Sequence, residues 1–531
     1  MPNTPSYPGV YIEELPSGVR TITGVPTSVT AFVGTAARGP VDEPIIINSF
    51  SDYERQFGSL SANSLMGYSV FHYFQNGGSS AVIVRLKGTN FANAILDLGN
   101  NVQVEAKYGG DYGRNIRART DQDGINDKAD AYNLTVRDIS TGQQERYPVI
   151  SIKNTPARSL DKLLESSQLV SVKSESRLDT LPEISEVITD GSDPFLTPGP
   201  EAGGDDDDGV GGDSATLAKR FVEGTGGKND TFGDASYGTA EAGTGLYALL
   251  KTDIFNLLVL PQLSSDADVS DSVRDKALKL CADRRAMLIV DPPLATNTVE
   301  EAVRATKAGD WIGGDESAKN AAFYFPRIKA QDQDGAIQEY APSGAIAGVF
   351  ARTDMKRGVW KAPAGTDATL NGVVGLTLKL TDLENNRLNP LGVNCLRSFP
   401  TLGPIVWGAR TLRGADLLGN EWKYVPVRRL ALFIEESLYR GTKWIVFEPN
   451  DEPLWSQIRL NVGAFMYNLF RQGAFQGRSP GEAYFVKCDK ESTTQNDVNL
   501  GIVNIIIGFA PLKPAEFVII KIQQMAGQVE T

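Results

Sequence analysis

Two apolar segments near the C-terminus place the strongest constraint on what this chain can fold into. Residues 498–510 read VNLGIVNIIIGFA, and residues 515–524 read AEFVIIKIQQ. Each is too short to cross a bilayer as a helix, which needs about 20 apolar residues. Both are rich in branched and aromatic side chains, which suit a pleated strand, and Pro511 and Pro514 separate them. The sequence therefore predicts two strands interrupted by two prolines.

The second of these segments is apolar on both faces. Side chains alternate along a strand, so Val518, Ile520 and Ile522 point one way while Phe517 and Ile519 point the other. Such a strand belongs inside a packed sheet, yet this one lies near the chain terminus, where segments fray unless they are tied down. We therefore expect a second subunit to hold it, through inter-subunit pairing of Phe517, Val518, Ile519 and Ile520.

Residues 1–25 predict an extended N-terminal arm. Prolines at positions 2, 5, 8 and 16 preclude a helix. Val10, Tyr11, Ile12 and Glu13 are typical of a short strand, but no hairpin partner follows them. A lone strand is unstable, so it joins a distant sheet of its own chain or adds to the edge of another chain's sheet. The arm has neither a basic nor an apolar leader pattern, so we expect no signal peptide.

Alternating strand and helix patterns predict an α/β domain built from two separate stretches, 26–88 and 245–355. Ser51 and Glu54 have the spacing of a capping box at the start of its first helix. The expected strands cover 28–34, 80–86, 253–261, 286–293 and 321–328, and the expected helices cover 51–58, 62–76, 273–285 and 299–309.

Residues 89–244 interrupt this domain and differ from it in character. They are polar and rich in Gly, Asp and Ser, and residues 196–213, which include four consecutive aspartates, show no hydrophobic pattern. Short strand patterns occur at 133–139 and 147–152. We interpret this block as a β-rich insertion on the surface.

One amphipathic helix is predicted at residues 454–470. Asp451 and Glu452 suit its positive end, Pro453 its first turn and Gly473 its stop. Its apolar face consists of Leu454, Trp455, Ile458, Val462, Phe465, Met466 and Leu469. Its other face carries Gln457, Arg459, Asn461, Asn468 and Arg471, which either meet solvent or contact a partner.

The residues that usually carry catalysis are scarce. The chain has one histidine, His72, inside the aromatic pattern YSVFHYF, which favours a core or interface role over a catalytic triad. Cys281, Cys395 and Cys488 are widely spaced and form neither a zinc pattern nor a disulfide framework. We expect buried thiols in a chain made in a reducing compartment.

Three ligand classes are also disfavoured. The stretch VEGTGGKND (222–230) lacks the first glycine of a phosphate loop and the Ser or Thr that would hold magnesium. Residues 120–130 and 330–339 contain Asp-x-Asp-Gly but neither the first aspartate nor the bidentate glutamate of a calcium loop, and turn geometry explains them. The net charge of −13 argues against nucleic-acid binding.

A series of motifs in this order resembles the sheath protein of contractile phage tails and phage-tail-like injection systems. The matching pieces are SYPGVYIEE (6–14), SVTAFVGTAARGP (28–40), GTGGKNDTFGDASYG (224–238), WKAPAG (360–365), LNPLGVN (388–394), VWGARTL (406–412), YVPVRRL (424–430), GTKWIVFEPN (441–450), Leu454-Trp455, FVKCD (485–489) and APLKPAEF (510–517). The resemblance covers everything except residues 88–220.

The resemblance implies a multidomain α/β (α+β) structural protein and no enzyme, without cofactor or metal. Six subunits would form a ring, rings would stack helically around an inner tube protein, and arms would add strands to neighbouring subunits. Residues 356–510 would form the C-terminal sheath domain facing the tube, and residues 511–531 the C-terminal arm. The expected partners are further copies of the chain, the inner tube, and the baseplate and terminal cap proteins.

The same resemblance turns the polar face of the helix at 454–470 into a candidate contact with the inner tube. Assembly in the bacterial cytoplasm is expected, with neither nucleic-acid binding nor direct membrane insertion. We favour an extracellular injection system, with the tail of a phage virion as the alternative. An α/β enzyme would need a catalytic set that the sequence does not show, and a secreted calcium-stabilised adhesin would need an export signal and complete Asp loops.

Overall fold

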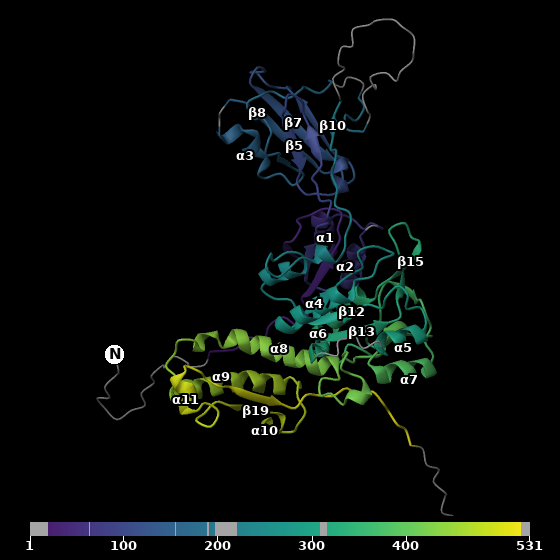
Figure 1. The fold of residues 1–531 in the computed structure, drawn as a ribbon, viewed down its shortest axis with the longest axis vertical. Helices are drawn as coiled ribbons and strands as arrows, with labels where there is room; N and C mark the ends of the chain where they lie inside the picture. The colour runs from purple at the N-terminus through teal and green to yellow at the C-terminus, as the bar shows by residue number, and fades with distance from the viewer. Residues whose placement is uncertain are drawn as a thin grey trace, which may run out of the picture.

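An eight-stranded sheet forms the centre of the protein in the computed structural model, which describes residues 20–62, 64–153, 156–187, 191–196, 220–307 and 316–521 (Figure 1). The neighbours from β3 to β17 pair in parallel, and β2 and β18 close the two edges in antiparallel fashion. In spatial order the strands are β18 (Gly403–Val406), β17 (Asn394–Phe399), β13 (Ala321–Phe325), β12 (Met287–Val290), β11 (Leu257–Val259), β1 (Thr30–Gly34), β3 (Ala81–Arg85) and β2 (Pro44–Ile47).

The inner strands form because they are almost continuously apolar. β1, β3 and β13 read TAFVG, AVIVR and AAFYF, and every residue in them is buried, as expected of strands that are covered on both faces. Helices α1 (Phe50–Phe57), α2 (Leu65–Gln75) and α6 (Ser343–Arg357) cover one face, and α4 (Asp271–Asp283) and α5 (Val299–Lys307) cover the other. The predicted α/β class is confirmed.

Two predictions about this domain are wrong: the residue at which it ends and the residue that caps its first helix. β17 and β18, which the sequence places in a C-terminal domain beginning at residue 356, extend the central sheet, since Tyr324 of β13 pairs with Asn394 of β17. Strand pairing across 70 residues leaves no trace in a local pattern. The helix cap is also displaced: the Ser49 hydroxyl accepts the Asp52 N–H at 3.1 Å, so Ser49 and not Ser51 caps α1.

The Asp-Gly loop within residues 330–339 lies in a small sheet beside the central one. β14 (Ile328–Gln331) pairs with β15 (Ile337–Tyr340) and with β16 (Val373–Leu376), ahead of the short helix α7 (Asp382–Leu388). In the β14–β15 hairpin the Asp332 carboxylate accepts the N–H groups of Asp334 and Ala336, as in an ordinary turn. Among the described residues no group of three His, Cys, Asp or Glu side chains is placed to hold a metal ion.

His72 lies in the apolar layer between α2 and the small sheet. It is 1% exposed, and its ring packs against Phe71 and Tyr340. Neither ring nitrogen has a hydrogen-bond partner among the described residues. Burial lowers the pKa of His72 from 6.5 to about 4. The predicted core position of His72 is confirmed.

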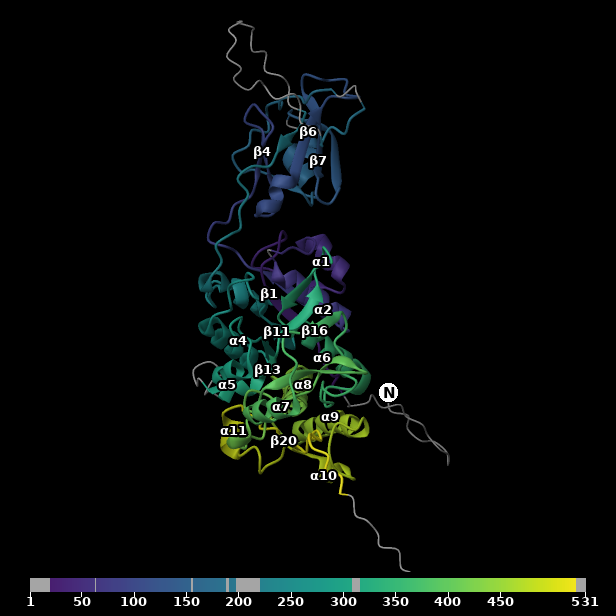
Figure 2. The ribbon, with the colours of Figure 1, turned by 90° about the vertical axis from the view of Figure 1, so that its right-hand side faces the viewer.

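The insertion forms a separate β-rich unit beyond the central domain (Figure 2). It has its own apolar core, between two antiparallel sheets with the short helix α3 (Leu160–Leu164) beside them. The strands are β10 (Val222–Glu223), β6 (Ile116–Asp121), β7 (Ala131–Asp138) and β8 (Gln144–Ser151) in one sheet, and β4 (Ile95–Asp97), β5 (Gln103–Ala106) and β9 (Val170–Val172) in the other. β7 and β8 confirm the strands predicted at 133–139 and 147–152.

Arg85, at the end of β3, connects the insertion to the central domain. Its buried guanidinium donates to the carbonyls of Ala36, Ala37 and Gly39 in the central domain and, at 2.7 Å, to that of Gly109 in the insertion. A buried charge needs its hydrogen bonds filled, and here four carbonyl groups do so. Arg85 therefore links the insertion to the central domain at this point.

The C-terminal domain packs two long helices against a small sheet. α8 (Val425–Gly441) and α9 (Glu452–Arg471) are its main helices; β19 (Tyr484–Lys487) and β20 (Ile506–Phe509) form the sheet, flanked by α10 (Pro480–Ala483) and α11 (Gln495–Asn499). The segment 498–510 thus forms a strand only at its end. Of the strand predicted at 515–524, residues 515–521 have no secondary structure in the single chain, and residues 522–524 lie outside the described residues.

A buried ion pair joins the C-terminal domain to the central one. Arg429 of α8 holds both carboxylate oxygens of Asp354 in α6 at 2.8 and 2.6 Å, and also donates to the Thr27 carbonyl at 2.7 Å. Both side chains of the pair are at most 4% exposed. Because a buried charge that loses its partner is costly, this pair holds α8 against α6.

Candidate assembly interface

Helix α9 begins and ends where the sequence predicts. Asp451 is the N-cap, and its carboxylate accepts the Leu454 N–H at 3.1 Å. Pro453 occupies the first turn, where its missing N–H costs nothing. Gly473 follows with φ of +78°, a left-handed conformation that favours glycine and ends the helix.

The apolar stripe of α9 is confirmed residue by residue. Each fully buried side chain of this type contributes about 1.5–3 kcal/mol of burial free energy. The apolar side chains of this stripe pack with Leu430 and Ile434 of α8. All seven members of the stripe are buried: Leu454, Trp455, Ile458, Val462, Phe465, Met466 and Leu469.

The polar residues of α9 differ in how exposed they are. Gln457, Asn468 and Arg471 are exposed. Asn461 does not share that face: it is 2% exposed, and its amide oxygen accepts the Arg20 N–H at 3.0 Å. The assignment of Asn461 to the exposed face is wrong because the chain entering from residue 20 covers it. Arg459 is half-buried and holds Glu452 at 2.7 Å.

The sheet of the C-terminal domain is open at its edges. β19 and β20 pair through four residues each, and no third strand joins them among the described residues. Apart from the isolated bridge between Phe475 and Pro511, no described strand pairs with the outer edges of β19 and β20, which leaves those edges open to a further strand. Such an edge is the usual acceptor of an added peptide strand.

One ion pair fixes the segment that follows this sheet. Arg410, fully buried, holds the two carboxylate oxygens of Glu516 at 2.8 and 2.7 Å. The Tyr424 hydroxyl donates to the same carboxylate at 3.1 Å, and Asp416 contacts Arg410 from another side at 3.0 Å. We call Arg410, Tyr424 and Glu516 the C-terminal clamp. Bidentate pairs of this kind are strong and directional.

The electrostatics of the clamp follow from its burial. Desolvation disfavours the charge on Arg410, but the hydrogen bonds and the charge of Glu516 outweigh it and raise the pKa of Arg410. Burial likewise raises the pKa of Tyr424, with the Glu516 charge adding to it. Arg410 therefore remains a cation that needs its carboxylate partner.

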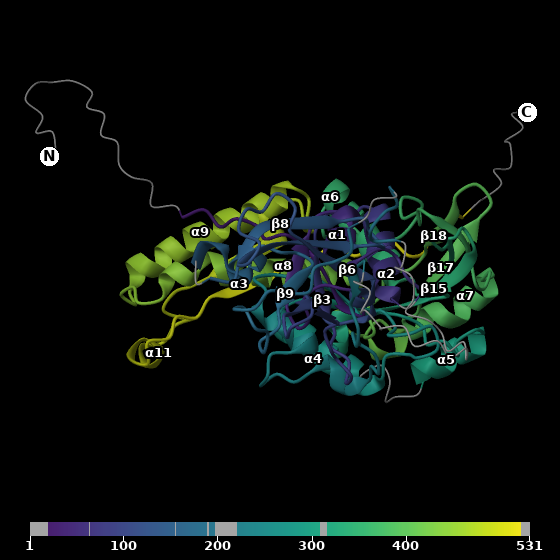
Figure 3. The ribbon, with the colours of Figure 1, turned by 90° about the horizontal axis from the view of Figure 1, so that it is seen from above.

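Beyond the clamp the chain projects from the subunit. The apolar side chains of Phe517, Val518, Ile519 and Ile520 are all at least 73% exposed. The first described residues lie beside α9, and the two ends of the described chain leave on opposite sides of the molecule (Figure 3). The predicted pairing residues Val10, Tyr11, Ile12 and Glu13 lie outside the described residues.

Family comparisons match most of the chain. Residues 235–412 match the phage tail sheath protein central domain, and residues 419–525 match the phage tail sheath C-terminal domain. The tail sheath protein of Burkholderia phage BcepMu is 24% identical over 486 residues, which cover 88% of this chain and 87% of that protein.

The chain belongs to the phage tail sheath family. It is a phage tail sheath protein, which is a structural subunit and not an enzyme. The family boundary at residue 412 agrees with the end of the central sheet at β18 and not with a boundary at 356.

Solved sheath structures share the fold. The PVC sheath of an extracellular contractile injection system, in its contracted state, is 23% identical with 98% of each chain covered and a TM-score of 0.56. The contracted helical sheath of the anti-feeding prophage is 22% identical, with 98% of this chain and 100% of that chain covered, at a TM-score of 0.54. The sheath tail protein from Listeria innocua is 16% identical, with 93% and 96% covered, at a TM-score of 0.57.

Sequence reasoning missed the clamp of the sheath subunit. Arg410 and Glu516 both lie in quoted motifs, VWGARTL and APLKPAEF, but nothing in the sequence links residues 106 positions apart. A glutamate directly before an apolar terminal strand was the available signal. In the described ranges no helix is both long and apolar enough to span a membrane.

Proposed function

We propose that this sheath subunit assembles into six-membered rings that stack helically around an inner tube, and that its two arms add strands to neighbouring subunits. The observation that carries the proposal is the segment Phe517–Ile520, which is apolar on both faces, exposed, and held away from the subunit by the clamp. A strand of this composition is stable only when both faces are covered.

The open edges of β19 and β20 are the proposed acceptors. An added strand of about five residues forms backbone hydrogen bonds that each contribute about 0.5–1.5 kcal/mol net. Burial of its branched and aromatic side chains adds about 1.5–3 kcal/mol each before ordering costs. The binding free energy from a single arm is then modest. Each subunit takes part in several such contacts, and their contributions add up across the lattice.

The exposed side of α9 is the proposed contact with the inner tube. Gln457, Asn468 and Arg471 remain candidates, and Arg471 has no ion-pair partner within the described part of the chain. Arg459 is a weaker candidate because Glu452 already neutralises it. Arg471→Glu should stop co-assembly on purified tubes; unchanged co-assembly would remove this contact from the proposal.

The proposed mechanism is mechanical. The extended sheath is a lattice of higher free energy that is held kinetically, and contraction turns rigid subunits while the arm pairings persist. The buried Arg429–Asp354 pair supports the rigid-body part, since it locks α8 to α6. The free energy of the new interfaces drives the tube outward through a target envelope. Baseplate and terminal cap proteins would bound the stack.

We place the particle among extracellular injection systems, with a phage virion as the second candidate. The small polar insertion and the near-complete coverage of the PVC and anti-feeding-prophage sheaths support this choice. The genes next to this one test it: capsid and terminase genes would identify a virion instead.

Negative-stain microscopy of the pure protein tests the assembly. Wild-type chain should form hollow helical tubes. A chain that ends after Glu516 keeps the clamp but lacks the exposed strand, and it should remain a soluble subunit of unchanged melting temperature. Tubes formed equally well by the shortened chain would contradict strand donation by the C-terminal arm.

A further inference from the structure

The turn between α8 and α9 carries an unshielded aromatic side chain. Phe447 is fully exposed, and the neighbouring Val446 is 62% exposed. Phe447 has φ of +73°, a left-handed conformation that residues other than glycine seldom adopt. Glu448 follows, exposed and without an ion pair among the described residues. We call Val446, Phe447 and Glu448 the knob: an aromatic tip with an acidic group beside it, from which the subunit itself gains no packing.

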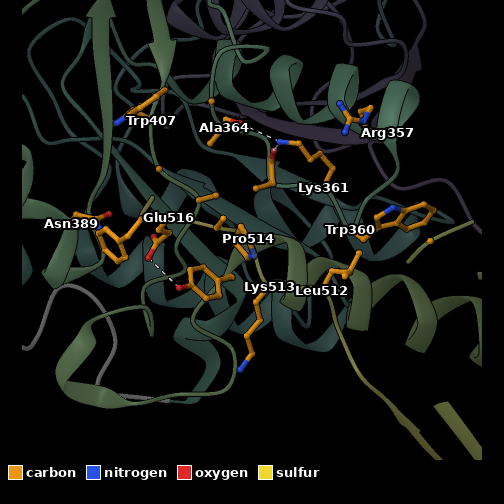
Figure 4. A pocket seen from close by; sticks show the side chains of 18 of the residues that line it. Arg357, Trp360, Lys361, Ala364, Asn389, Trp407, Leu512, Lys513, Pro514 and Glu516 are labelled. Atoms are coloured by element: carbon orange, nitrogen blue, oxygen red, sulfur yellow. Dashed lines mark hydrogen bonds between the residues drawn. The ribbon is translucent and has the colours of Figure 1, made fainter. Parts of the chain in front are cut away.

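A hollow of about 690 Å³ lies at the opposite end of α9. Trp360 and Trp407 stand on opposite sides of it with Lys361 between them (Figure 4). Gln472, which directly follows α9, lines it too, and the clamped segment from Leu512 to Phe517 forms one wall. The hollow therefore exists only while the clamp holds that segment in place.

The hollow has the charge opposite to that of the knob. Arg357, Lys361 and Lys513 line it. Arg357 is paired with Asp367 at 3.7 Å, so Lys361 and Lys513 supply the available positive charge, and the carboxylate in the lining, Glu516, is engaged by Arg410. The Lys361 ammonium donates to the carbonyls of Ala362 and Ala364 at 3.0 and 3.5 Å and forms no ion pair in the described ranges, although the charge of the nearby Asp367 acts to raise its pKa. Burial lowers the pKa of Lys361, a shift that a bound carboxylate would reverse.

Helix α9 separates the two features. It has 20 residues and is thus about 30 Å long, with the knob just before its first residue and the hollow just after its last. A knob cannot reach the hollow of its own subunit. A feature at one end that fits a different feature at the other end makes a heterologous contact, which closes into a ring or continues as a helix.

We propose that the knob of one sheath subunit docks into the hollow of the next, with Phe447 between Trp360 and Trp407 and Glu448 beside Lys361. Aromatic rings gain from offset or edge-to-face contact beyond the area that they bury, and a carboxylate partner satisfies the half-buried ammonium. The contact is formed by side chains and is distinct from strand addition by the arms. It rests on the proposed function only in that copies of this chain assemble.

Cross-linking tests the contact in the full chain. The double variant Phe447→Cys/Ala364→Cys, treated with a short bismaleimide linker after assembly, should give a ladder of covalent multimers, because each heterologous contact leaves both ends able to react again. The native Cys281, Cys395 and Cys488 are buried, so the linker spares them. The matched control Phe447→Cys/Ile337→Cys, with its second thiol exposed on β15, should give no ladder.

The outcomes separate this contact from the proposed function. Tubes of the double variant that give no ladder, or a control that gives the same ladder, would overturn the docking of the knob and leave the sheath assembly intact. If the wild-type chain forms no tubes and the double variant gives no ladder, both the docking of the knob and the proposed sheath assembly are overturned.

A second variant excludes a merely structural role for Phe447. Phe447→Gly relieves the left-handed backbone, so the melting temperature of the subunit should stay the same or rise. The protein concentration needed for half-maximal assembly should rise about tenfold or more, as when an interface aromatic is removed. Leu417→Ala removes an equally exposed apolar side chain and should change neither quantity. Assembly of Phe447→Gly at the wild-type concentration would overturn the proposal.

Discussion

Strand β3 and the C-terminal segment have nearly interchangeable sequences and opposite environments. β3 reads AVIVR, and every one of its residues is fully buried. Residues 517–521 read FVIIK, and the four apolar side chains are 73–82% exposed. Each segment ends in a cation, but Arg85 is enclosed by four carbonyl groups whereas Lys521 lies exposed.

The difference lies in what the rest of the chain supplies. β3 lies between β1 and β2 and under two helical layers, so its pattern is satisfied within one subunit. The terminal segment is anchored at Glu516 and given no cover beyond it. An apolar strand pattern thus marks a need for partners, and the fold decides whether the same chain provides them.

The largest expected effect is on the buried strand. Ile83→Ala opens a cavity in the sheet core and should lower the free energy of unfolding by about 2–5 kcal/mol. Urea denaturation of the soluble subunit measures it. A loss below 1 kcal/mol would mean that the helical layers do not hold β3 as tightly as its burial indicates.

Acid should weaken the layer that covers the sheet while leaving the terminal segment unaffected. His72 has a pKa of about 4 when folded against 6.5 unfolded, so its contribution is fully present above pH 6.5 and is lost as the pH falls towards 4. The loss at pH 4 is about 3 kcal/mol. Asp291 acts in the opposite sense, because burial raises its pKa to about 6.

The variant His72→Phe isolates the histidine contribution. The stability of the wild type relative to His72→Phe should fall by about 3 kcal/mol between pH 7 and pH 4, since the Asp291 contribution is common to both chains. A difference that is constant with pH would show that His72 is not buried as a neutral ring.

Weakening the clamp should have an intermediate effect. Glu516→Gln leaves Arg410 with a neutral partner and should cost about 1–3 kcal/mol of stability while speeding the hydrogen exchange of the backbone amides in residues 512–517. Asp416 is a second contact of Arg410 and its side chain is 45% exposed, so Asp416→Asn serves as the milder control. Equal hydrogen exchange in both variants would contradict the idea that Glu516 fixes the segment.

The smallest expected effect on the stability of the subunit comes from a substitution that should abolish assembly. Ile520→Asp should change the free energy of unfolding by no more than about 0.5 kcal/mol, because the side chain is 79% exposed. The same change places a charge inside a neighbour's sheet and should abolish tubes in negative stain. Lys521→Asp, also exposed, is the matched control and should retain them.

Much of the fold was predictable where the pattern is local. The buried strands and the stripe of α9 follow from periodicity and composition, because neighbouring residues alone decide which face is apolar. Asn461 was misplaced because its partner, Arg20, lies 441 residues away. The domain boundary at 356 was wrong for the same reason, since β17 finds its place only beside β13.

The sequence by itself determined the family, the α/β class and the apolar pattern of the terminal segment, since motif order and apolar periodicity are properties of short stretches. Only the tertiary structure decided which side chains enclose which. It brought Arg410 to Glu516, left Phe447 exposed at one end of α9, and opened a basic hollow between two tryptophans at the other. Contacts of this kind depend on how distant segments pack, and that is a property of the whole chain.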